Sequence, residues 1–426
     1  MKRRFKTLLF ALVAMAMPLV ASAQTKVEIG GIWYNLTAET LEAEVTKSDG
    51  TEYSGPITLT ATVTYDDVAY SVTSIGDWAF NGCTDLTAIT IPEGVTSIGN
   101  FAFHNCSSLT AITIPESVTS IGNKAFDICR SLTSIVVAKG NKVYDSRGDC
   151  NAIIETNSNT LIQGCATTII PEGVTSIGDG AFRACSSLTT ITIPKGVTNI
   201  GDEAFSNCGS LTAITIPEGV TRIGDETFYA CTDLTDITIP EGVTSIGDYA
   251  FKSCSSLTDI TIPEGVTSIG MSAFEACNNL TDITIPEGVT SIGDYAFLAC
   301  DSLTAITIPE SVTSIGYRAF NACRSLTSIV IAKGNKVYDS RGDCNAIIET
   351  NSNTLIQGCA TTTIPEGVTS IGDYAFYACA DLTAITIPED VTSIGDRAFF
   401  NCSSLTAITI PEGVTSIGDR AFFNCI

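Results

Sequence analysis

The sequence is dominated by a unit of 23 residues that recurs along most of the chain. One copy, VTSIGDYAFLACDSLTAITIPES, runs from Val289 to Ser311. Copies begin at Val72, Val95, Val118, Val174, Val197, Val220, Val243, Val266, Val289, Val312, Val368, Val391 and Val414. A unit this short cannot bury its apolar side chains alone, so it gains a core only by stacking on its neighbours. The repeat therefore predicts a solenoid rather than a set of globular domains.

Each unit has a pattern that predicts its local structure. Leu303, Ile306 and Ile308 have the L-x-x-I-x-I spacing of a short strand with three inward side chains. The following Ile-Pro-Glu-Gly predicts a type I turn with Pro at the second position. The Ala-Phe-x-x-Cys spacing that ends at Cys323 predicts one helical or 3-10 turn. The expected fold is a curved rod of stacked coils, each built from a β-strand and a short helical or 3-10 turn, spanning residues 72–426.

Two units are longer, and the first 71 residues follow a different pattern. The segment 138–168 returns almost unchanged at 332–362. In it, Ile153/Ile154 and Leu161/Ile162 flank an Asn-Ser-Asn turn, which predicts a β-hairpin that projects from the rod. Between residues 24 and 71, apolar and polar residues alternate, which is typical of β-hairpins. We expect this segment to be a small N-terminal β cap that covers the first coil.

The N-terminal residues 1–23 have the features of a secretory signal peptide. A basic start is followed by an apolar stretch from Leu8 to Val20 and by the small residues Ala21, Ser22 and Ala23. The apolar stretch is too short to span a membrane, and no later stretch is long enough for a transmembrane segment. The sequence therefore predicts an exported protein that is secreted or held at the cell surface.

The charge of the chain restricts its partners. The formal net charge is −24, and removal of the four basic residues of the signal peptide takes it to −28. Such an acidic surface repels nucleic acid and anionic lipid headgroups. We therefore expect no nucleic-acid partner.

Seventeen cysteines in an exported protein raise the question of disulfides. Thirteen occupy one slot of the repeat, three residues after a recurring Phe, and we expect them to be free thiols buried in the core. The other four lie in the two long units. Cys150 and Cys165 are equidistant from one predicted hairpin turn, as Cys344 and Cys359 are from the other. Positions related in this way face each other across a hairpin, so we expect two disulfides after export.

No motif in the sequence indicates catalysis, a cofactor or a metal. His104 is the only histidine, and it occupies a variable slot that other units fill with Asn, Asp, Arg or Tyr. Nucleotide-binding, HExxH and GxSxG motifs are absent. Acidic residues recur in two columns, Glu after the turn Pro and Asp after Ile-Gly. These columns are expected to be solvated, since they lack the clustered ligands of a dedicated Ca²⁺ loop. We therefore expect no enzyme, no cofactor and no metal site.

The positions that vary between units are the better candidates for a binding surface. They are the slot after Ile-Gly-x and the slot after the recurring Phe, both expected to be exposed. Aromatic and Arg side chains on a rigid frame are the types that contribute most to protein binding. The candidates are Trp78, Phe101, Tyr229, Tyr249, Tyr295, Arg318, Tyr374, Tyr377, Arg397, Phe400, Arg420 and Phe423.

A second candidate is a tripeptide found in integrin ligands. It occurs as Arg147-Gly148-Asp149 and again as Arg341-Gly342-Asp343, in both cases next to a predicted hairpin. Strings of three residues arise often by chance, and both copies come from one duplication. Integrin binding by this tripeptide is therefore a minor hypothesis.

The repeated pattern C-x-x-L-T-x-I-x-I-P-x-x-V-T-x-I-G-x-x-A-F-x-x-C resembles the BspA-like leucine-rich-repeat family of bacterial surface antigens. So do the N-x-V-Y-D-S-R-x-x-C-N-A-I-I-E-T segment of the long units and the stretch from Tyr70 to Gly76. The resemblance implies a leucine-rich-repeat solenoid that acts in adhesion and binds extracellular-matrix, plasma or cell-surface proteins. Because repeat similarity specifies a scaffold better than a ligand, two alternatives stay open: a carbohydrate-binding module and a structural spacer.

Overall fold

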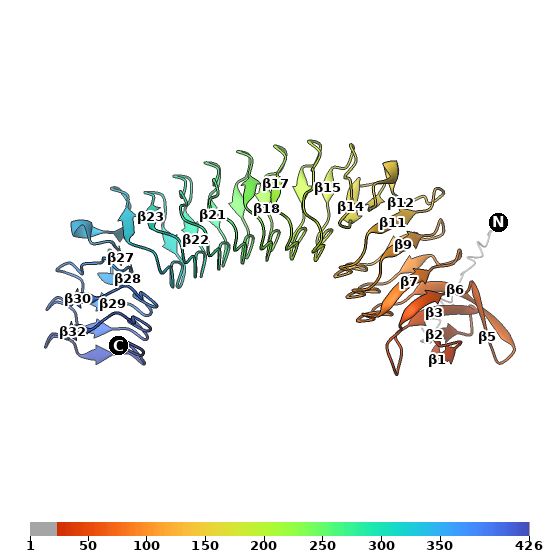
Figure 1. Ribbon diagram of the computed structural model, residues 1–426, viewed down its shortest axis with the longest axis horizontal. Coiled ribbons are helices and arrows are strands. Elements are labelled where there is room, and N and C mark those ends of the chain that lie inside the picture. Colours follow the sequence, from red (N-terminus) through yellow and green to blue (C-terminus); the bar gives the residue numbers. More distant parts are fainter. Residues whose placement is uncertain (1–23, 426) are drawn as a thin grey trace, which may run out of the picture.

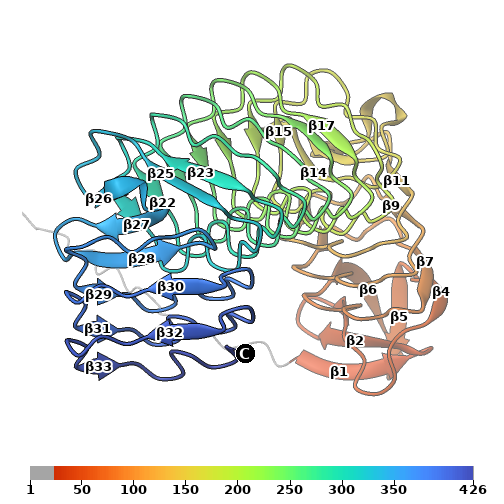
Figure 2. The ribbon, with the colours of Figure 1, turned by 60° about the vertical axis from the view of Figure 1, so that its left-hand side comes forward.

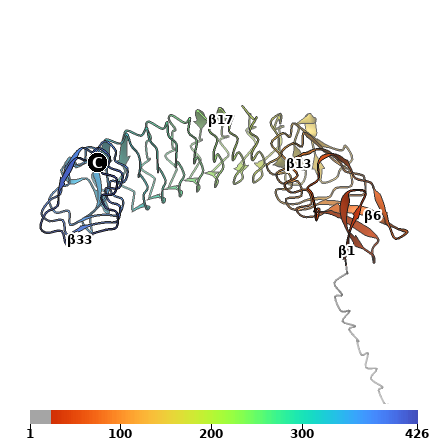
Figure 3. The same ribbon diagram turned by 60° about the horizontal axis from the view of Figure 1, so that its bottom comes forward.

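The structure, a computed structural model, describes residues 24–425, and the predicted signal peptide lies outside them. The chain is a solenoid of stacked β coils that forms an arch, with the N-terminal strands at one end and residue 425 near the other (Figure 1). Turned views show the coils as successive loops of similar outline (Figures 2 and 3). Except for two 3-10 turns, η1 (Arg147–Asp149) and η2 (Arg341–Asp343), the described residues contain no helix. The solenoid predicted from the repeat is confirmed.

The N-terminal strands continue into the first coil of the repeat. They are β1 (Gln24–Ile29), β2 (Ile32–Thr37), β3 (Glu42–Thr46), β4 (Gly55–Thr58), β5 (Thr62–Tyr65) and β6 (Val68–Ile75). β1, β2 and β3 pair in antiparallel order, and β3 then pairs in parallel with β6, which carries the first Val-Thr-Ser-Ile. Tyr34, Leu36 and Val45 are buried in the same hydrophobic cluster as Phe80. These strands therefore cover the apolar side of the first coil.

Every coil has two extended edges that pair differently. The Ser-Ile edge forms strand runs through three to five adjacent coils, whereas the Leu-x-x-Ile strands form pairs that single bridges, such as Thr190 to Ala213, extend. The Ser-Ile strands are β8 (Ser97–Ile98), β10 (Ser120–Ile121), β15 (Ser176–Ile177), β16 (Asn199–Ile200), β18 (Arg222–Ile223), β20 (Ser245–Ile246), β21 (Ser268–Ile269), β22 (Ser291–Ile292), β24 (Ser314–Ile315), β29 (Ser370–Ile371), β31 (Ser393–Ile394) and β33 (Ser416–Ile417). The Leu-x-x-Ile strands are β7 (Leu86–Thr90), β9 (Ala111–Ile114), β11 (Ser134–Val137), β17 (Ala213–Thr215), β19 (Asp236–Thr238), β23 (Ala305–Ile308), β25 (Ser328–Ile331), β30 (Ala384–Thr386) and β32 (Ala407–Thr409).

The corner between Ile-Gly and Cys is not the helical turn expected from its spacing. It contains two residues with positive φ, for example Tyr249 at 57° and Ser253 at 64°. Alternate amides bond to the next coil: the Phe251 N–H donates to the Ala273 carbonyl at 2.8 Å, and the Tyr249 N–H to the Met271 carbonyl at 2.7 Å. The Lys252 and Cys254 amides bond back within the turn, to the Tyr249 and Phe251 carbonyls at 3.1 Å. Stacking thus satisfies the backbone groups that a helix would pair internally. The Ala-Phe-x-x-Cys spacing imitates a helical period without forming one.

The turn after the Leu-x-x-Ile edge is also displaced from the expected one. The Val266 N–H donates to the Pro263 carbonyl at 3.0 Å, so Pro is the first residue of the turn and not the second. The Glu and Gly that follow are its two central residues. In some coils this Gly has positive φ, 88° at Gly173 and 81° at Gly367, a conformation that Gly adopts without a Cβ clash.

The core is a set of ladders of like side chains. The recurring Phe forms one column, with neighbouring rings 5.3 Å apart and stacked between Phe274 and Phe297. The Cys column lies beside it, and most of its thiols donate to a Phe carbonyl of the preceding coil, as Cys277 does to Phe251 at 3.1 Å. Cys185 and Cys379, which follow the long units, face a Gly carbonyl instead. The expectation of buried free thiols in this column is confirmed, with Cys379 and Cys425 half-buried.

The Asp column after Ile-Gly joins consecutive coils. Asp225 Oδ1 accepts the backbone N–H of Asp248 at 2.9 Å, and Asp248 Oδ1 accepts that of Met271 at 2.7 Å. These bonds require close approach, which explains the preceding Gly. A Cβ on Gly270 would lie 2.5 Å from the backbone carbon of Gly247. The Asp column, expected from the sequence to be only solvated charge, also links each coil to the next through these hydrogen bonds.

The hairpins of the two long units lie within the stack and do not project, contrary to the prediction. Their strands are β12 (Tyr144–Asp145), β13 (Ile153–Glu155) and β14 (Thr160–Gln163), repeated as β26 (Tyr338–Asp339), β27 (Ala346–Glu349) and β28 (Thr354–Gly358). β14 pairs in parallel with β15, and Ile154 and Leu161 are fully buried. The apolar pairs that indicated a hairpin bury their side chains between the flanking coils. The hairpin is therefore one more coil of the solenoid.

Candidate binding surface

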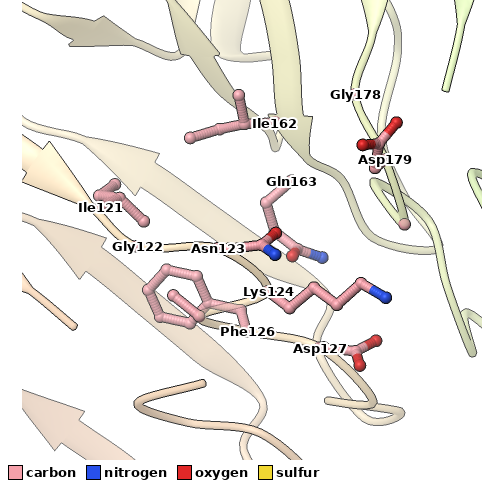
Figure 4. A pocket seen from close by; sticks show the side chains of 12 residues that line it. Ile121, Gly122, Asn123, Lys124, Phe126, Asp127, Ile162, Gln163, Gly178 and Asp179 are labelled. Atoms are coloured by element: carbon pink, nitrogen blue, oxygen red, sulfur yellow. The ribbon is translucent and has the colours of Figure 1, made fainter. Parts of the chain in front are cut away.

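The long units interrupt the corner column and open a cleft there. Gly164 occupies the place of the Phe in the intervening coil, and a Cβ at this residue would collide with the Phe182 ring. The Phe stack is therefore broken between Phe126 and Phe182. A cleft of about 190 Å³ lies beside this break, lined by Asn123, Lys124 and other residues (Figure 4). The second long unit has a corresponding cleft of about 300 Å³ between Gly316 and Asp373.

The first cleft contains a neutralised network of charges. Asp127 is buried, and its Oδ2 lies 2.7 Å from Arg183 Nη1 and 3.5 Å from His104 Nε2. Lys124 Nζ lies 2.8 Å from Glu203 Oε1. Burial raises the pKa of the Asp127 carboxyl, and the Arg183 charge opposes that rise. Each cation of this cleft already has a carboxylate partner. His104, an unremarkable variable residue in the sequence, belongs to this network.

The second cleft has a different chemistry at the same positions. Arg318 corresponds to Lys124, and its guanidinium carbon lies 4.5 Å from the ring centre of Tyr374 and 4.6 Å from that of Tyr377. The Tyr295 ring is 5.7 Å away on the preceding coil. Asn321 takes the place of Asp127 and donates to the Tyr374 carbonyl at 2.8 Å. Among the described residues Arg318 forms no ion pair, and its buried Nε has no hydrogen-bond partner.

The aromatic surface continues from this cleft along the next coils. Tyr377 stacks on Phe400 at 5.3 Å, and Phe400 stacks on Phe423 at 5.1 Å. Arg397 donates a hydrogen bond to the Tyr374 hydroxyl. We call this set the tyrosine–arginine cluster: Tyr295, Tyr317, Arg318, Tyr374, Tyr377, Arg397, Phe400 and Phe423.

Most of the candidates predicted from the sequence are half-buried and not fully exposed. The exceptions are Trp78 and Phe423, with 43% and 54% of their surface exposed, and Arg420, which is also exposed. Trp78 stacks on Phe101 at 4.2 Å and forms a smaller aromatic pair near the N-terminal end. Tyr249 packs under Lys252, 5.3 Å from its ring centre. Tyr229, Tyr249 and Arg420 are not part of the tyrosine–arginine cluster.

Sequence reasoning missed Tyr317, which is 45% exposed and lies at the centre of the cluster. Its ring centre is 5.7 Å from that of Tyr295 and 5.6 Å from that of Tyr374. It occupies the slot directly after Ile-Gly, which holds Asp or Asn in every other unit except at Met271. That departure from the Asp column was a visible signal. No signal in the sequence indicated Asn321. Its hydrogen bond to Tyr374 exists only because the break in the coil stack brings the two residues together.

In both copies of the integrin-type tripeptide, the arginine side chain forms hydrogen bonds to other side chains of this protein. Arg147 Nε donates to Asp145 Oδ1 at 2.9 Å, and its Nη1 donates to Asn159 Oδ1 at 3.0 Å. Arg341 in the second copy makes the same bond to Asp339 at 2.9 Å. An external carboxylate would have to replace these charge-assisted bonds. This geometry does not favour the tripeptide as an integrin-binding loop.

The expected disulfides between Cys150 and Cys165 and between Cys344 and Cys359 are absent, because all four are free thiols. The hairpin register shifts by one residue between Ile153 and Ile154, which removes the symmetry on which the prediction relied. Cys150 packs in the cluster that contains Phe182, whereas Cys165 belongs to the cluster on the other side of the break. The second hairpin has the same shift.

Thiol titration is expected to find buried, unreactive cysteines. Burial raises the pKa of Cys129, Cys231 and Cys277 to about 12, so the reactive thiolate is scarce at pH 8. In the native protein, a thiol reagent at pH 8 should label at most the half-buried Cys379 and Cys425 within minutes. In guanidinium without reductant it should label all 17 cysteines. A count of 13 in guanidinium would contradict the structure and restore the two hairpin disulfides.

Residues 24–425 contain neither a metal-binding cluster nor a membrane-spanning helix. No group of three or more His, Cys, Asp or Glu side chains there is arranged to hold a metal ion. Within the same range, no helix has the length and apolar character needed to cross a membrane.

Comparison with known proteins identifies the family. Residues 60–150, 154–279, 221–341 and 343–426 match the BspA type leucine rich repeat region. The chain belongs to this family. A leucine-rich repeat protein from Bacteroides ovatus is 32% identical, with 94% of this chain and 92% of that chain covered and a TM-score of 0.55. No curated protein matches the chain.

Two further solved proteins are similar to the chain at lower sequence identity. A leucine rich cell surface protein from Faecalibacterium prausnitzii is 26% identical, covering 95% of this chain and 87% of that chain with a TM-score of 0.34. The pneumococcal vaccine antigen PcpA is 17% identical, covering 93% of this chain and 99% of that chain with a TM-score of 0.49. The BspA-type repeat, a non-catalytic scaffold in its typical form, explains the ladders of the core. It does not explain the tyrosine–arginine cluster.

Proposed function

We propose that this chain is an exported, non-catalytic adhesion protein that binds a protein partner through the tyrosine–arginine cluster. The observation that supports the proposal most is the local departure from the repeat. The segment 138–168 is identical to 332–362, yet the corner residues around the second cleft have diverged into tyrosines and arginines. Residues of these types are the ones that contribute most at protein interfaces. A rigid stack already fixes the positions of these side chains, so binding costs little conformational entropy.

The proposed setting follows from the signal peptide and the family. An exported BspA-type repeat protein would meet extracellular-matrix, plasma or cell-surface proteins. The acidic scaffold supports the exclusion of nucleic acid as a partner. The cluster gathers two arginines on this acidic chain, which favours a partner with both apolar and acidic side chains at its binding surface.

A binding assay on immobilised matrix and plasma proteins tests the proposal. The wild type should bind at least one of them. A variant with Tyr374, Tyr377, Arg397 and Phe400 changed to Ala should bind at least about tenfold more weakly, because it loses its aromatic and Arg anchors. Its thermal midpoint should remain near that of the wild type, since these side chains lie outside the core ladders.

The control is a variant with Tyr229 and Tyr249 changed to Ala, in the same slots but outside the cluster; it should bind like the wild type. Equal loss in both variants would contradict the proposal. A glycan array is run in parallel, because tyrosine faces beside Asn and Asp also suit sugars. Binding to glycans alone would favour a carbohydrate-binding module. Binding to neither proteins nor glycans would favour a structural spacer.

A further inference from the structure

The second cleft differs from the first because its central cation, Arg318, has no carboxylate partner among the described residues. In the first cleft Lys124 and Arg183 are neutralised by Glu203 and Asp127. In the second, Arg318 lies among three tyrosine rings without an acidic partner in the described residues. The buried Nε of Arg318 donates no hydrogen bond; Arg183 Nε of the first cleft donates none either, but it lies 3.1 Å from the Glu203 carboxylate. A buried guanidinium nitrogen without an acceptor is unfavourable, because its hydration is lost and not replaced.

Two polar residues that line the second cleft, Asp373 and Asn321, make hydrogen bonds to groups other than Arg318. Asp373 lines the cleft, but its Oδ1 accepts the Asp396 backbone N–H at 2.7 Å. Asn321 replaces the carboxylate that Asp127 supplies in the first cleft, and its amide group donates to the Tyr374 carbonyl. Arg397 stands where Glu203, the partner of Lys124, stands in the first cleft, so the second cleft lacks two carboxylates relative to its duplicate.

We propose that the second cleft binds a carboxylate of the protein partner, an Asp or Glu side chain, which pairs with Arg318 between the tyrosine rings. This inference rests on the proposed protein-binding function and deepens it by naming the chemistry of the anchor. The guanidinium presents donors that fit a carboxylate, and the flanking rings hold it in place and limit its hydration. The cleft, of about 300 Å³, accommodates one such side chain.

The charge around the cleft favours a single carboxylate over a polyanion. Acidic columns run along the corner beside the cleft, with Asp294, Asp373, Asp396 and Asp419 on the coils around it. A sulfated polysaccharide would bring many negative charges against these carboxylates and be repelled. A protein segment with one acidic side chain among apolar residues avoids that repulsion and contacts the stacked rings of Tyr377 and Phe400.

The test uses N-acetyl-glutamate N-methylamide as a probe, with ligand-observed NMR on the full mature chain. The wild type should bind this probe at least about tenfold more tightly than the neutral glutamine analogue. Arg318→Gln should lose the preference. Arg397→Glu should also lose it, because it restores the carboxylate that pairs with Lys124 at the corresponding place in the first cleft. A heparin-derived disaccharide serves as the polyanion arm.

The matched control is Lys124→Gln, which makes the corresponding change in the first cleft and should leave binding of the probe unchanged. Thermal midpoints of all variants show whether the fold is retained. The inference is wrong if the wild type does not prefer the glutamate probe, if the preference survives in Arg318→Gln, or if only the disaccharide binds. Capture of matrix proteins that persists alongside any of these results would leave the proposed function standing, so the two failures are distinguishable.

Discussion

Truncation of Phe251 to Ala is expected to lower the free energy of unfolding by about 3–5 kcal/mol. The ring is fully buried and stacks on Phe228 at 5.4 Å and on Phe274 at 5.3 Å. Its removal leaves a cavity in the middle of a column whose spacing is fixed by hydrogen bonds between coils, so the walls cannot collapse. Urea unfolding followed by circular dichroism measures the change.

Tyr249→Ala, two residues away in the same corner, is the control for Phe251→Ala. Its side chain is half-exposed, so we expect a loss well below that of Phe251→Ala. Because a solenoid interacts mainly with nearest neighbours, the defect in Phe251→Ala should also broaden the transition as the two halves uncouple. Equal destabilisation by the two variants would contradict the assignment of the Phe column as the core.

Substitution of Gly270 by Ala is expected to destabilise the protein by about 1–3 kcal/mol or more. The added methyl would lie 2.5 Å from the Gly247 carbonyl carbon and 2.7 Å from the Asp248 backbone nitrogen. These are backbone atoms held by the inter-coil ladder, so relief requires the coils to separate. The thermal midpoint and the urea transition both report this loss.

Gly242→Ala provides the matched comparison, since it changes the turn Gly of a nearby unit. A Cβ there has its nearest contact at 3.5 Å, with the Glu218 carbonyl oxygen, which is ordinary van der Waals distance. We expect little change in stability. If Gly242→Ala were as harmful as Gly270→Ala, glycine at the corner would be required for its flexibility and not for the close approach of the coils.

The sequence was sufficient to predict the stacking and its core, because every inward residue recurs in register. The same regularity concealed the local geometry of the corner. An Ala-Phe-x-x-Cys spacing fits a helical turn in isolation, but the backbone donors of Tyr249, Phe251 and Ser253 are satisfied by the following coil. A pattern within one unit cannot show a hydrogen bond that exists only between units.

Only part of the candidate surface could be predicted, because contacts between units do not appear in the pattern of one unit. Tyr374, Tyr377 and Arg397 were visible as departures from the repeat. Their assembly around Arg318 was not visible, because a break in the coil stack brings together residues more than 50 positions apart. The hairpin cysteines show the opposite error. Their symmetrical spacing in the sequence suggested disulfides that the structure does not contain. A single shift in strand register between Ile153 and Ile154 removes that pairing.

The most direct test of the account exchanges the second cleft for the first. Since the two long units share one backbone arrangement, the first cleft supplies replacements that this backbone already accepts. The exchanged variant carries Tyr317→Asn, Arg318→Lys, Asn321→Asp, Tyr374→Gly, Tyr377→Arg and Arg397→Glu. The measurement is its affinity, relative to the wild type, for the matrix or plasma protein that the wild type binds. The account predicts an unchanged thermal midpoint and binding weakened at least about tenfold. Undiminished binding by a folded variant would show that the partner contacts the repeated scaffold and not the tyrosine–arginine cluster.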